Sequence, residues 1–276
     1  MCSCQLDSYE SCGVTLLGDT RCPCGVTFAF TERTGGVSHA PYASLNLSDR
    51  MGDDVQAVAA NRVRVLDALG ASERADWLLV PTQTHDSRIC ILNSTDPAEL
   101  ERARDFARES SDAVVCTVRD FPVMLLGADC ALIVLVAPGG FAIAHCGWKG
   151  TLAHLVKTTA QTLCETVRCT PAELSAYIGP HIRGWDYEVS PKLLDRFVAE
   201  FGDVVRVQGK ECHLSLAAAL KADLYSVGLA PEAIGDCELS TLSNPERFFS
   251  HRHDGARTGR HGAIAWMASE RGDNVA

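Results

Sequence analysis

The residue types best suited to chemistry in this chain stand at the ends of two short apolar segments. Cys130 directly precedes the run Ala131–Val136, and His145 directly follows the run Phe141–Ala144. Because both runs are short and the turn at 137–140 reads Ala-Pro-Gly-Gly, they are typical of buried strands. A hairpin with this turn brings its open ends together, so we expect Cys130 and His145 to be neighbours. A thiolate beside an imidazole indicates either a metal site or a Cys–His nucleophile pair.

Two further positions are candidates because of where they stand relative to an expected element. His85 follows the apolar run Trp77–Val80, where a histidine is more often a hydrogen-bonded structural residue than a ligand. Lys149 stands just before a segment at 151–167 with the apolar spacing of a helix, for which Thr151 is the expected cap. Free N–H groups at such a helix start can bind an anion beside Lys149, or the lysine is simply solvated. Both interpretations stay open at this stage.

Polar residues also concentrate in a long loop and near the C-terminus. The loop at 31–54 holds Arg33 and Asn46, and we expect it either to face a substrate or to be an irregular surface loop. The segment 245–261 contains four arginines and three histidines directly before an apolar strand. A polar cluster this dense is more typical of a site wall than of a linker.

Alternating apolar patterns predict an α+β (mixed α/β) fold, with mixed β-sheets flanked by helices in a single compact domain. We expect the residues 26–276 to form this domain, because no repeat or low-complexity linker interrupts them, and residues 1–25 to be a variable extension. Connection lengths leave the strand order open. The expected strands are Val26–Phe30, Trp77–Val80, Arg88–Leu92, Ser111–Val118, Leu174–Gly179 and Ala263–Met267. The expected helices cover 54–69, 97–108, 151–167, 191–201 and 214–227.

Composition and charge exclude several classes of protein. A formal net charge of -10 argues against nucleic acid or an anionic membrane as the main partner, since both favour a basic surface. No apolar run reaches the roughly 18 residues that span a bilayer. The N-terminus has no basic segment followed by an apolar one, so it is not a secretory signal, and we expect a cytoplasmic protein.

Cysteine is frequent in this chain, with 13 residues, an odd number. In a reducing cytoplasm these residues are expected to be free or buried thiols. Five of them lie in residues 1–24, including the pairs Cys2-Ser3-Cys4 and Cys22-Pro23-Cys24. Such pairs can bind a soft metal, but their spacing does not match the usual zinc pattern, and a partly ordered extension is the favoured interpretation.

Several short motifs in the same order resemble the YfiH family, and together they extend over about residues 26–267. Members of that family were first described as laccase-like polyphenol oxidases and are now associated with purine nucleoside phosphorylase, adenosine deaminase and methylthioadenosine phosphorylase activities. The motifs are TERTGGVS at 31–38, ASLNL at 43–47, GDD at 52–54, QTH at 83–85, GADC at 127–130, AHCGWKGT at 144–151, GPHI at 179–182 and NPERFFS at 244–250. So many separate motifs make a chance match unlikely to account for the pattern.

The resemblance implies that His85, Cys130 and His145 together bind one zinc, with copper as the alternative metal. A His₂Cys ligand set leaves the fourth position open, which is the arrangement of a catalytic zinc. Purine nucleosides and phosphate are then the expected partners, and a monomer is the expected state. We assign the secondary roles as hypotheses, with Asn46 contacting ribose or base and phosphate held by Arg33, Lys149, Arg252 and Arg260.

This chain departs from the family pattern at three positions. Lys149 and His253 stand where the family usually or commonly has Arg, and Cys146 stands where it usually has Ala. Lysine keeps the charge but lacks the planar, two-pronged grip of arginine on phosphate. Cys146 follows His145 in a strand, so we expect it to point to the opposite face and not to be a ligand.

Four functions are weighed against each other. The first is a zinc-dependent purine nucleoside phosphorylase with adenosine deaminase activity, and the second is a metal-free hydrolase or deamidase with Cys130 as nucleophile and His145 as base. The third, polyphenol oxidation with copper, is discounted as the native activity because only His251-Arg252-His253 has the His-x-His form. The fourth is a non-enzymatic scaffold, which three potential ligands on separate strands argue against.

Overall fold

The structure, a computed structural model, describes residues 4–269, whose strands form two sheets. One sheet is antiparallel, and its five strands lie in the order β1 (Asp7–Ser11), β2 (Val14–Gly18), β3 (Val26–Thr31), β11 (His261–Met267) and β6 (Val123–Gly127). The other is mixed, and its six strands lie in the order β10 (Ile234–Asp236), β9 (Ser175–Ile178), β7 (Ala131–Ala137), β8 (Gly140–Cys146), β5 (Ala113–Cys116) and β4 (Ile89–Leu92). Only its outermost pairs, β10 with β9 and β4 with β5, are parallel.

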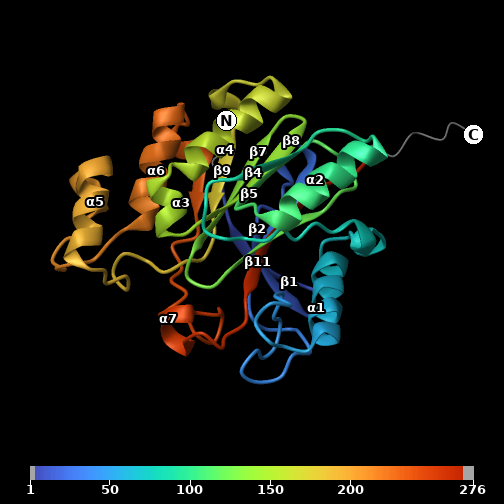
Figure 1. Cartoon of the computed structure of the whole chain (residues 1–276), viewed down its shortest axis with the longest axis horizontal. Helices are drawn as coiled ribbons and strands as arrows, with labels where there is room; N and C mark the ends of the chain where they lie inside the picture. The colour runs from blue at the N-terminus through green and yellow to red at the C-terminus, as the bar shows by residue number, and fades with distance from the viewer. Residues whose placement is uncertain (1–3, 270–276) are drawn as a thin grey trace, which may run out of the picture.

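The two sheets pack against each other, and helices cover their outer faces (Figure 1). Large side chains from both sheets fill the space between them, among them Phe28 and Phe30 of β3 and Leu132 and Val134 of β7. α4 and α6 cover the outer face of the mixed sheet, and α1 covers that of the antiparallel sheet. The helices are α1 (Val55–Ala68), α2 (Pro97–Glu109), α3 (Trp148–Leu152), α4 (Leu155–Val167), α5 (Pro191–Phe201), α6 (Leu216–Val227) and α7 (His251–Asp254). This single mixed α/β domain confirms the predicted fold class.

The hairpin of β7 and β8 has the predicted form. Its strands are fully buried and antiparallel, with Leu132 opposite His145 and Ala131 opposite Cys146. Cys130 is the next residue before this ladder, so the turn at the far end fixes the relative position of Cys130 and His145. The short apolar runs therefore predicted the pairing of two site residues correctly.

The N-terminal segment differs from the expectation of a partly ordered extension. Val14, Leu16 and Leu17 of β2 are buried, and β2 pairs with both β1 and β3. The expectation was wrong for β1 and β2, because their apolar residues become part of a core only through pairing with distant strands. Cys2 and Ser3 of the first Cys-x-Cys pair lie outside the described residues.

Two other predicted boundaries are wrong. The run Trp77–Val80 is not a strand, since Trp77 ends the 3-10 helix η2 (Ser72–Trp77) and Leu79 makes only an isolated bridge to β6. The predicted helix at 151–167 is two helices, because His154 adopts a left-handed conformation (φ 54°) between α3 and α4. Thr151 is not a cap but lies inside α3, where its hydroxyl donates to the Gly147 carbonyl.

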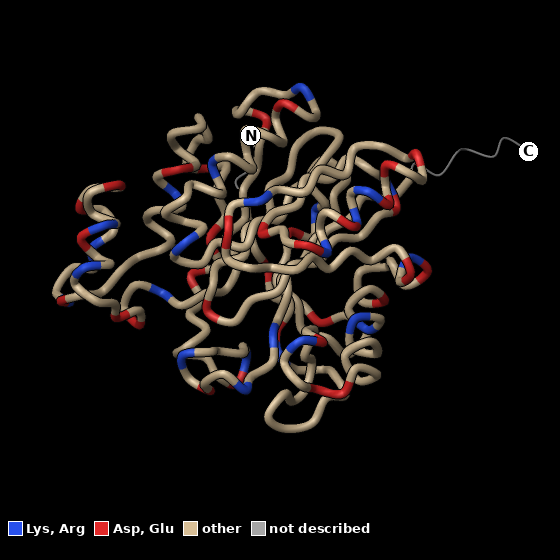
Figure 2. The backbone as a smooth tube through the Cα atoms, viewed as in Figure 1, with Lys and Arg blue, Asp and Glu red and all other residues tan. Residues whose placement is uncertain are grey.

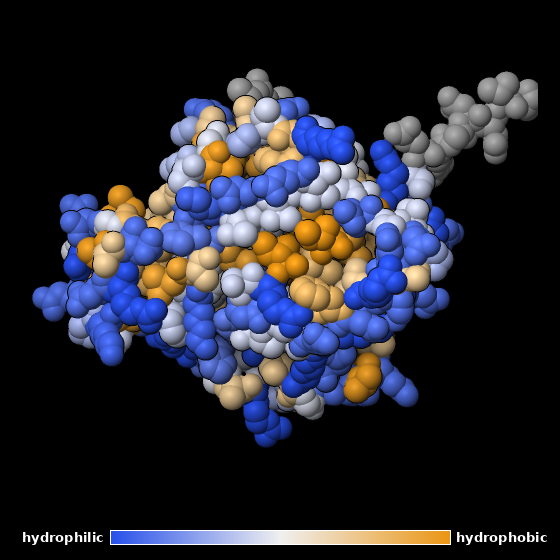
Figure 3. Space-filling view, turned by 45° about the horizontal axis from the view of Figure 1, so that its top comes forward, coloured by the Kyte–Doolittle hydropathy of each residue, from blue (hydrophilic) through white to orange (hydrophobic). Residues whose placement is uncertain are grey.

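Charges of both signs mix on the surface of the described residues. Figure 2 shows Lys and Arg interleaved with Asp and Glu, as on α2, where Arg108 pairs with Glu101 and Asp105. On the face drawn in Figure 3, hydrophilic side chains surround a central apolar area. None of the described helices is long and apolar enough to cross a membrane.

The long loop at 31–54 is held in place by one residue of α1. Asn61 is fully buried, accepts the Val37 N–H at 2.8 Å and donates to the Ser38 hydroxyl at 2.9 Å. The same amide donates to the Ser44 and Asn46 carbonyls at 3.1 and 2.8 Å. A buried polar group that loses its partner costs free energy, so this amide determines the path of the loop.

We predict that Asn61→Ala lowers the free energy of unfolding by about 3 kcal/mol, because it leaves the Val37 N–H and the Ser44 and Asn46 carbonyls without their partner. Alanine favours a helix, so the loss cannot come from α1 itself. Urea unfolding measures it. Asn93→Ala, at an exposed position, is the matched control and should change stability by less than about 0.5 kcal/mol. Equal stability of the two variants would contradict the role of Asn61.

Candidate metal centre

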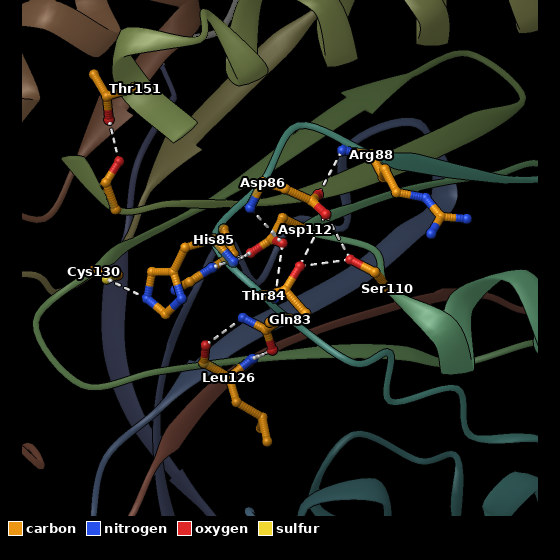
Figure 4. Close-up of polar contacts among 12 residues, drawn as sticks. Gln83, Thr84, His85, Asp86, Arg88, Ser110, Asp112, Leu126, Cys130 and Thr151 are labelled. Atoms are coloured by element: carbon orange, nitrogen blue, oxygen red, sulfur yellow. Dashed lines mark hydrogen bonds and ion pairs between the residues drawn. The ribbon is translucent and has the colours of Figure 1, made fainter. Parts of the chain in front are cut away.

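Three side chains from separate segments converge at one edge of the mixed sheet. One ligand atom each from His85, Cys130 and His145 lies within 4.8 Å of the others. The Cys130 Sγ atom is 3.8 Å from His85 Nε2, a contact drawn in Figure 4, and the two imidazole rings meet edge to face at 4.8 Å. Two imidazoles and a thiolate are ligands that zinc prefers, and soft or borderline metals in general bind such a set. The donor chemistry therefore fits a metal ion.

A single carboxylate positions two of the three residues. Asp112 is fully buried. Its Oδ1 accepts from the main-chain N–H of His85 at 3.1 Å and from the ring nitrogen Nδ1 of His145 at 2.8 Å. Its Oδ2 accepts from the Thr84 and Asp86 N–H groups, both at 3.0 Å (Figure 4). Because Nδ1 of His145 is bound in this way, Nε2 is the nitrogen left for a metal.

Left-handed backbone conformations orient His85 and Cys130. His85 has φ 62°, and Asp129, the residue before Cys130, has φ 84°. Non-glycine residues seldom adopt such angles unless their surroundings hold them. Asp112 holds the first turn, while the Asp129 carboxylate accepts from the Thr241 hydroxyl at 2.6 Å and the Arg252 N–H at 2.7 Å.

The proton balance of the three groups is set by their mutual contacts. Burial alone would raise the pKa of the Cys130 thiol, but His145 and His85 lower it to about 6. Burial alone would lower the pKa of His145, but Cys130 and Asp112 raise it to about 9. These contacts therefore favour the thiolate of Cys130 and the protonated imidazole of His145, and a metal ion competes with the His145 proton when it binds.

A cavity of about 460 Å³ opens beside these residues. The segment from Leu126 to Cys130 lines it, and so do both apolar and charged side chains. The apolar wall residues are Met51, Val80, Pro81, Trp148, Ile182, Tyr187 and Leu216. The lining also contains three arginines, Arg50, Arg252 and Arg260, together with the carboxylates of Asp49 and Asp129.

Arg252 and Arg260, both predicted as phosphate holders, line this cavity. Arg252 donates to the Glu188 carbonyl, and its guanidinium lies over the Tyr187 ring at 5.3 Å. Arg260 uses one guanidinium nitrogen to bond the Thr258 and Gly259 carbonyls. Burial lowers the pKa of Arg260, an effect that Cys130 and Asp129 oppose.

Three predicted binding residues lie elsewhere. Arg33 packs on the Phe249 ring at 4.4 Å and donates to main-chain carbonyls. Asn46 is fully buried and accepts the Arg260 N–H, while Lys149 extends over the Trp148 ring at 5.7 Å. None of the three is among the described residues that line the cavity, so their roles in binding stay predictions.

Several residues of the site could not be predicted from the sequence. Asp112 stands before an apolar strand, a common place for an acid, and only the pairing of β5 with β8 brings it to His145. Gln83 bonds both main-chain groups of Leu126 and joins the His85 loop to the cavity lining (Figure 4). Burial, reinforced by Cys130, raises the pKa of Tyr187 to about 12.

Cys146, expected on the opposite face, is buried in the core beneath α4.

Fold and site together define a mixed α/β protein with a His–Cys–His group beside a cavity that three arginines line. The multi-copper polyphenol oxidoreductase laccase family matches residues 27–268, and the chain belongs to this family, the YfiH family that the motifs resemble. The crystal structure of YlmD from Geobacillus stearothermophilus superposes with a TM-score of 0.82 at 26% identity, covering 95% of this chain and 98% of that one. For YfiH of Bacillus licheniformis these values are 0.81, 27%, 94% and 97%.

The chain is also similar in sequence to proteins named purine nucleoside phosphorylases. The chain is 34% identical over 251 residues to a purine nucleoside phosphorylase of Deinococcus radiodurans, covering 90% of this chain and 91% of that protein. It is 32% identical over 244 residues to one of Corynebacterium glutamicum, covering 87% and 94%. The chain is thus homologous to purine nucleoside phosphorylases over nearly its full length.

We predict that Asp112→Asn lowers the affinity for zinc by about ten- to a hundredfold, because the amide cannot accept from all four donors and orients His145 poorly. Competition with a chromophoric chelator measures the affinity. Asp105→Asn, on the exposed side of α2, is the control and should bind zinc as the unaltered protein does. If Asp112→Asn matched that control, the carboxylate would not position the ligands.

Proposed function

We propose that this chain is a zinc-dependent purine nucleoside phosphorylase that accepts inosine, guanosine, adenosine and methylthioadenosine and also deaminates adenosine. The observation that carries the proposal is the convergence of His85, Cys130 and His145 at a cavity lined by arginines. Homology to purine nucleoside phosphorylases over nearly the full length supports it. His85, Cys130 and His145 would hold the zinc, and the resident ion supplies Lewis acidity and lowers the pKa of water.

The cavity suits a nucleoside together with phosphate. Its volume of about 460 Å³ lies within the range usual for small-molecule sites, about 300–1,000 Å³. The Trp148, Tyr187 and Leu216 side chains offer an apolar surface for a purine base. Arg252 and Arg260 offer planar guanidinium groups, which bind phosphate oxygens in pairs.

Phosphorolysis makes a defined demand on these residues. A phosphate oxygen forms a bond to the anomeric carbon of ribose while the bond from that carbon to the purine nitrogen breaks, and the electron pair leaves with the base. The arginines hold the phosphate and restrict its approach to the anomeric carbon. Their charge also stabilises the phosphate as a dianion inside a partly buried cavity.

A metal-free Cys–His hydrolase is the second candidate. The observation in its favour is the position of Cys130 beside His145 and His85, whose contacts lower the pKa of its thiol, which is the pairing that activates a thiol nucleophile. Elemental analysis separates the two proposals, since one equivalent of zinc supports the first and a metal-free, rapidly alkylated Cys130 supports the second. Laccase-like oxidation with copper is proposed only as a side reaction, because the described residues contain one such ligand group.

We expect His85→Ala and Cys130→Ala to lose zinc and to release hypoxanthine from inosine and phosphate at least about a hundredfold more slowly, since each removes a ligand. The matched control variants are His39→Ala and Cys12→Ser, which replace exposed residues and should keep both zinc and activity. Undiminished hypoxanthine release by zinc-free variants would end the proposal. Assays of all four nucleosides with and without phosphate then distinguish phosphorolysis from deamination.

For Arg260→Ala we expect the KM for phosphate to rise at least about tenfold while the KM for inosine changes little, because a charge-assisted contact to phosphate contributes about 1.5–3 kcal/mol. Arg260→Lys should recover part of the loss, since it keeps the charge but not the planar geometry. Arg102→Ala on exposed α2 serves as the control. A rise confined to the KM for inosine would place Arg260 at the nucleoside instead.

A further inference from the structure

Two thiols touch at the C-terminal end of α4, remote from the metal centre. The Sγ atoms of Cys164 and Cys169 are 3.8 Å apart. Arg168 between them adopts a left-handed conformation (φ 59°, ψ 43°), and the Cys169 N–H bonds to the Cys164 carbonyl at 3.1 Å. This is the long-range hydrogen bond of a Schellman motif, which turns the chain back so that the residue after the turn contacts the last helical turn. An apolar contact usually occupies that place, and here both residues are cysteines.

We propose that Cys164 and Cys169 form a reversible disulfide, a modification site separate from Cys130. A disulfide requires the two sulfur atoms at about 2.05 Å. The hydrogen bond between the two residues already holds their main chains together, so rotation of the two side chains has to supply the remaining approach. The motif therefore provides a main-chain geometry in which the bond can form without unfolding the helix.

The oxidant is a small disulfide of the glutathione class. Cys169 is the more exposed of the two, so its thiolate attacks one sulfur of the small disulfide and releases the first small thiol. The Cys164 thiolate then attacks the Cys169 sulfur and releases the second small thiol. In total the protein loses two protons and two electrons, and the small disulfide is reduced to two thiols.

A third thiol competes for Cys169. Cys24, in the loop between β2 and β3, is close enough that Cys169 and Glu173 contribute to raising its pKa, after burial. Burial, then Cys169, Glu173 and Glu165, raise the pKa of Cys164 to about 12. Both groups are therefore protonated at rest, and Cys164 gives up its proton to solvent when it attacks the Cys169 sulfur. The Schellman hydrogen bond restrains Cys164 and Cys169 relative to each other, which favours their bond over one between Cys24 and Cys169.

The test uses the full chain loaded with zinc and incubated with oxidised glutathione, followed by blocking of free thiols and trypsin digestion. Trypsin cleaves after Arg168, so the disulfide joins peptide 158–168 to peptide 169–183, each of which contains a single cysteine. We expect this linked pair, its separation by reductant, and a rise in Tm, because a cross-link restricts the unfolded chain.

Single variants show which thiols take part. Cys24→Ala should still give the linked pair, whereas Cys164→Ala should stop at a glutathione adduct on Cys169. If unaltered protein gave only that adduct, or a link from peptide 169–183 to the peptide containing Cys24, the proposal would be overturned. The readout on unaltered protein does not depend on any variant folding, and none of it depends on nucleoside turnover.

Discussion

The structure of the site depends on one buried carboxylate. Asp112 is fully buried, and a buried ion is costly in free energy unless charged or polar partners surround it. Its partners are His145 Nδ1 and the N–H groups of Thr84, His85 and Asp86. Burial would raise the pKa of Asp112, but these contacts keep it below the ordinary value. The same bonds that stabilise the charge therefore fix the imidazole of His145 and the turn that carries His85.

A second carboxylate connects the His–Cys–His group to Arg252 of the cavity lining. Asp129 stands next to Cys130, and it accepts the main-chain N–H of Arg252 at the start of α7. Asn46 ties Arg260 to the loop at 31–54, since it accepts the Arg260 main-chain N–H while its own amide donates to Ser48 and Asp53. Cys130 and Arg252 thus belong to one frame, because the residue next to Cys130 is hydrogen-bonded to the main chain of Arg252.

The sequence predicted the parts of this site that depend on local structure. The short runs and the Pro-Gly turn around Cys130 and His145 determine a hairpin without help from distant residues, and the hairpin formed as expected. His85 could not be linked to them by spacing, because its position depends on Asp112, 27 residues further on. The family resemblance provided that link, and the geometry of the three side chains agrees with it.

Other parts depended on contacts that no local pattern shows. β1 and β2 become part of the sheet because β2 pairs with the distant strand β3 and β1 pairs with β2. Trp77–Val80 has the composition of a strand but lies at the end of a 3-10 helix. Arg33 and Asn46 are unusual residues for a connector, yet they bind main-chain groups, side chains and the Phe249 ring within the protein. Arg50 and Tyr187 reach the cavity only through the tertiary fold.

X-ray absorption spectroscopy of the zinc-loaded chain tests the central claim most directly, because it reports the atoms bound to the ion. We expect a shell of one sulfur at about 2.3 Å and two imidazole nitrogens at about 2.0 Å, completed by one lighter atom. A shell without sulfur, or with two or more sulfur atoms, would show that the ion is not held by His85, Cys130 and His145.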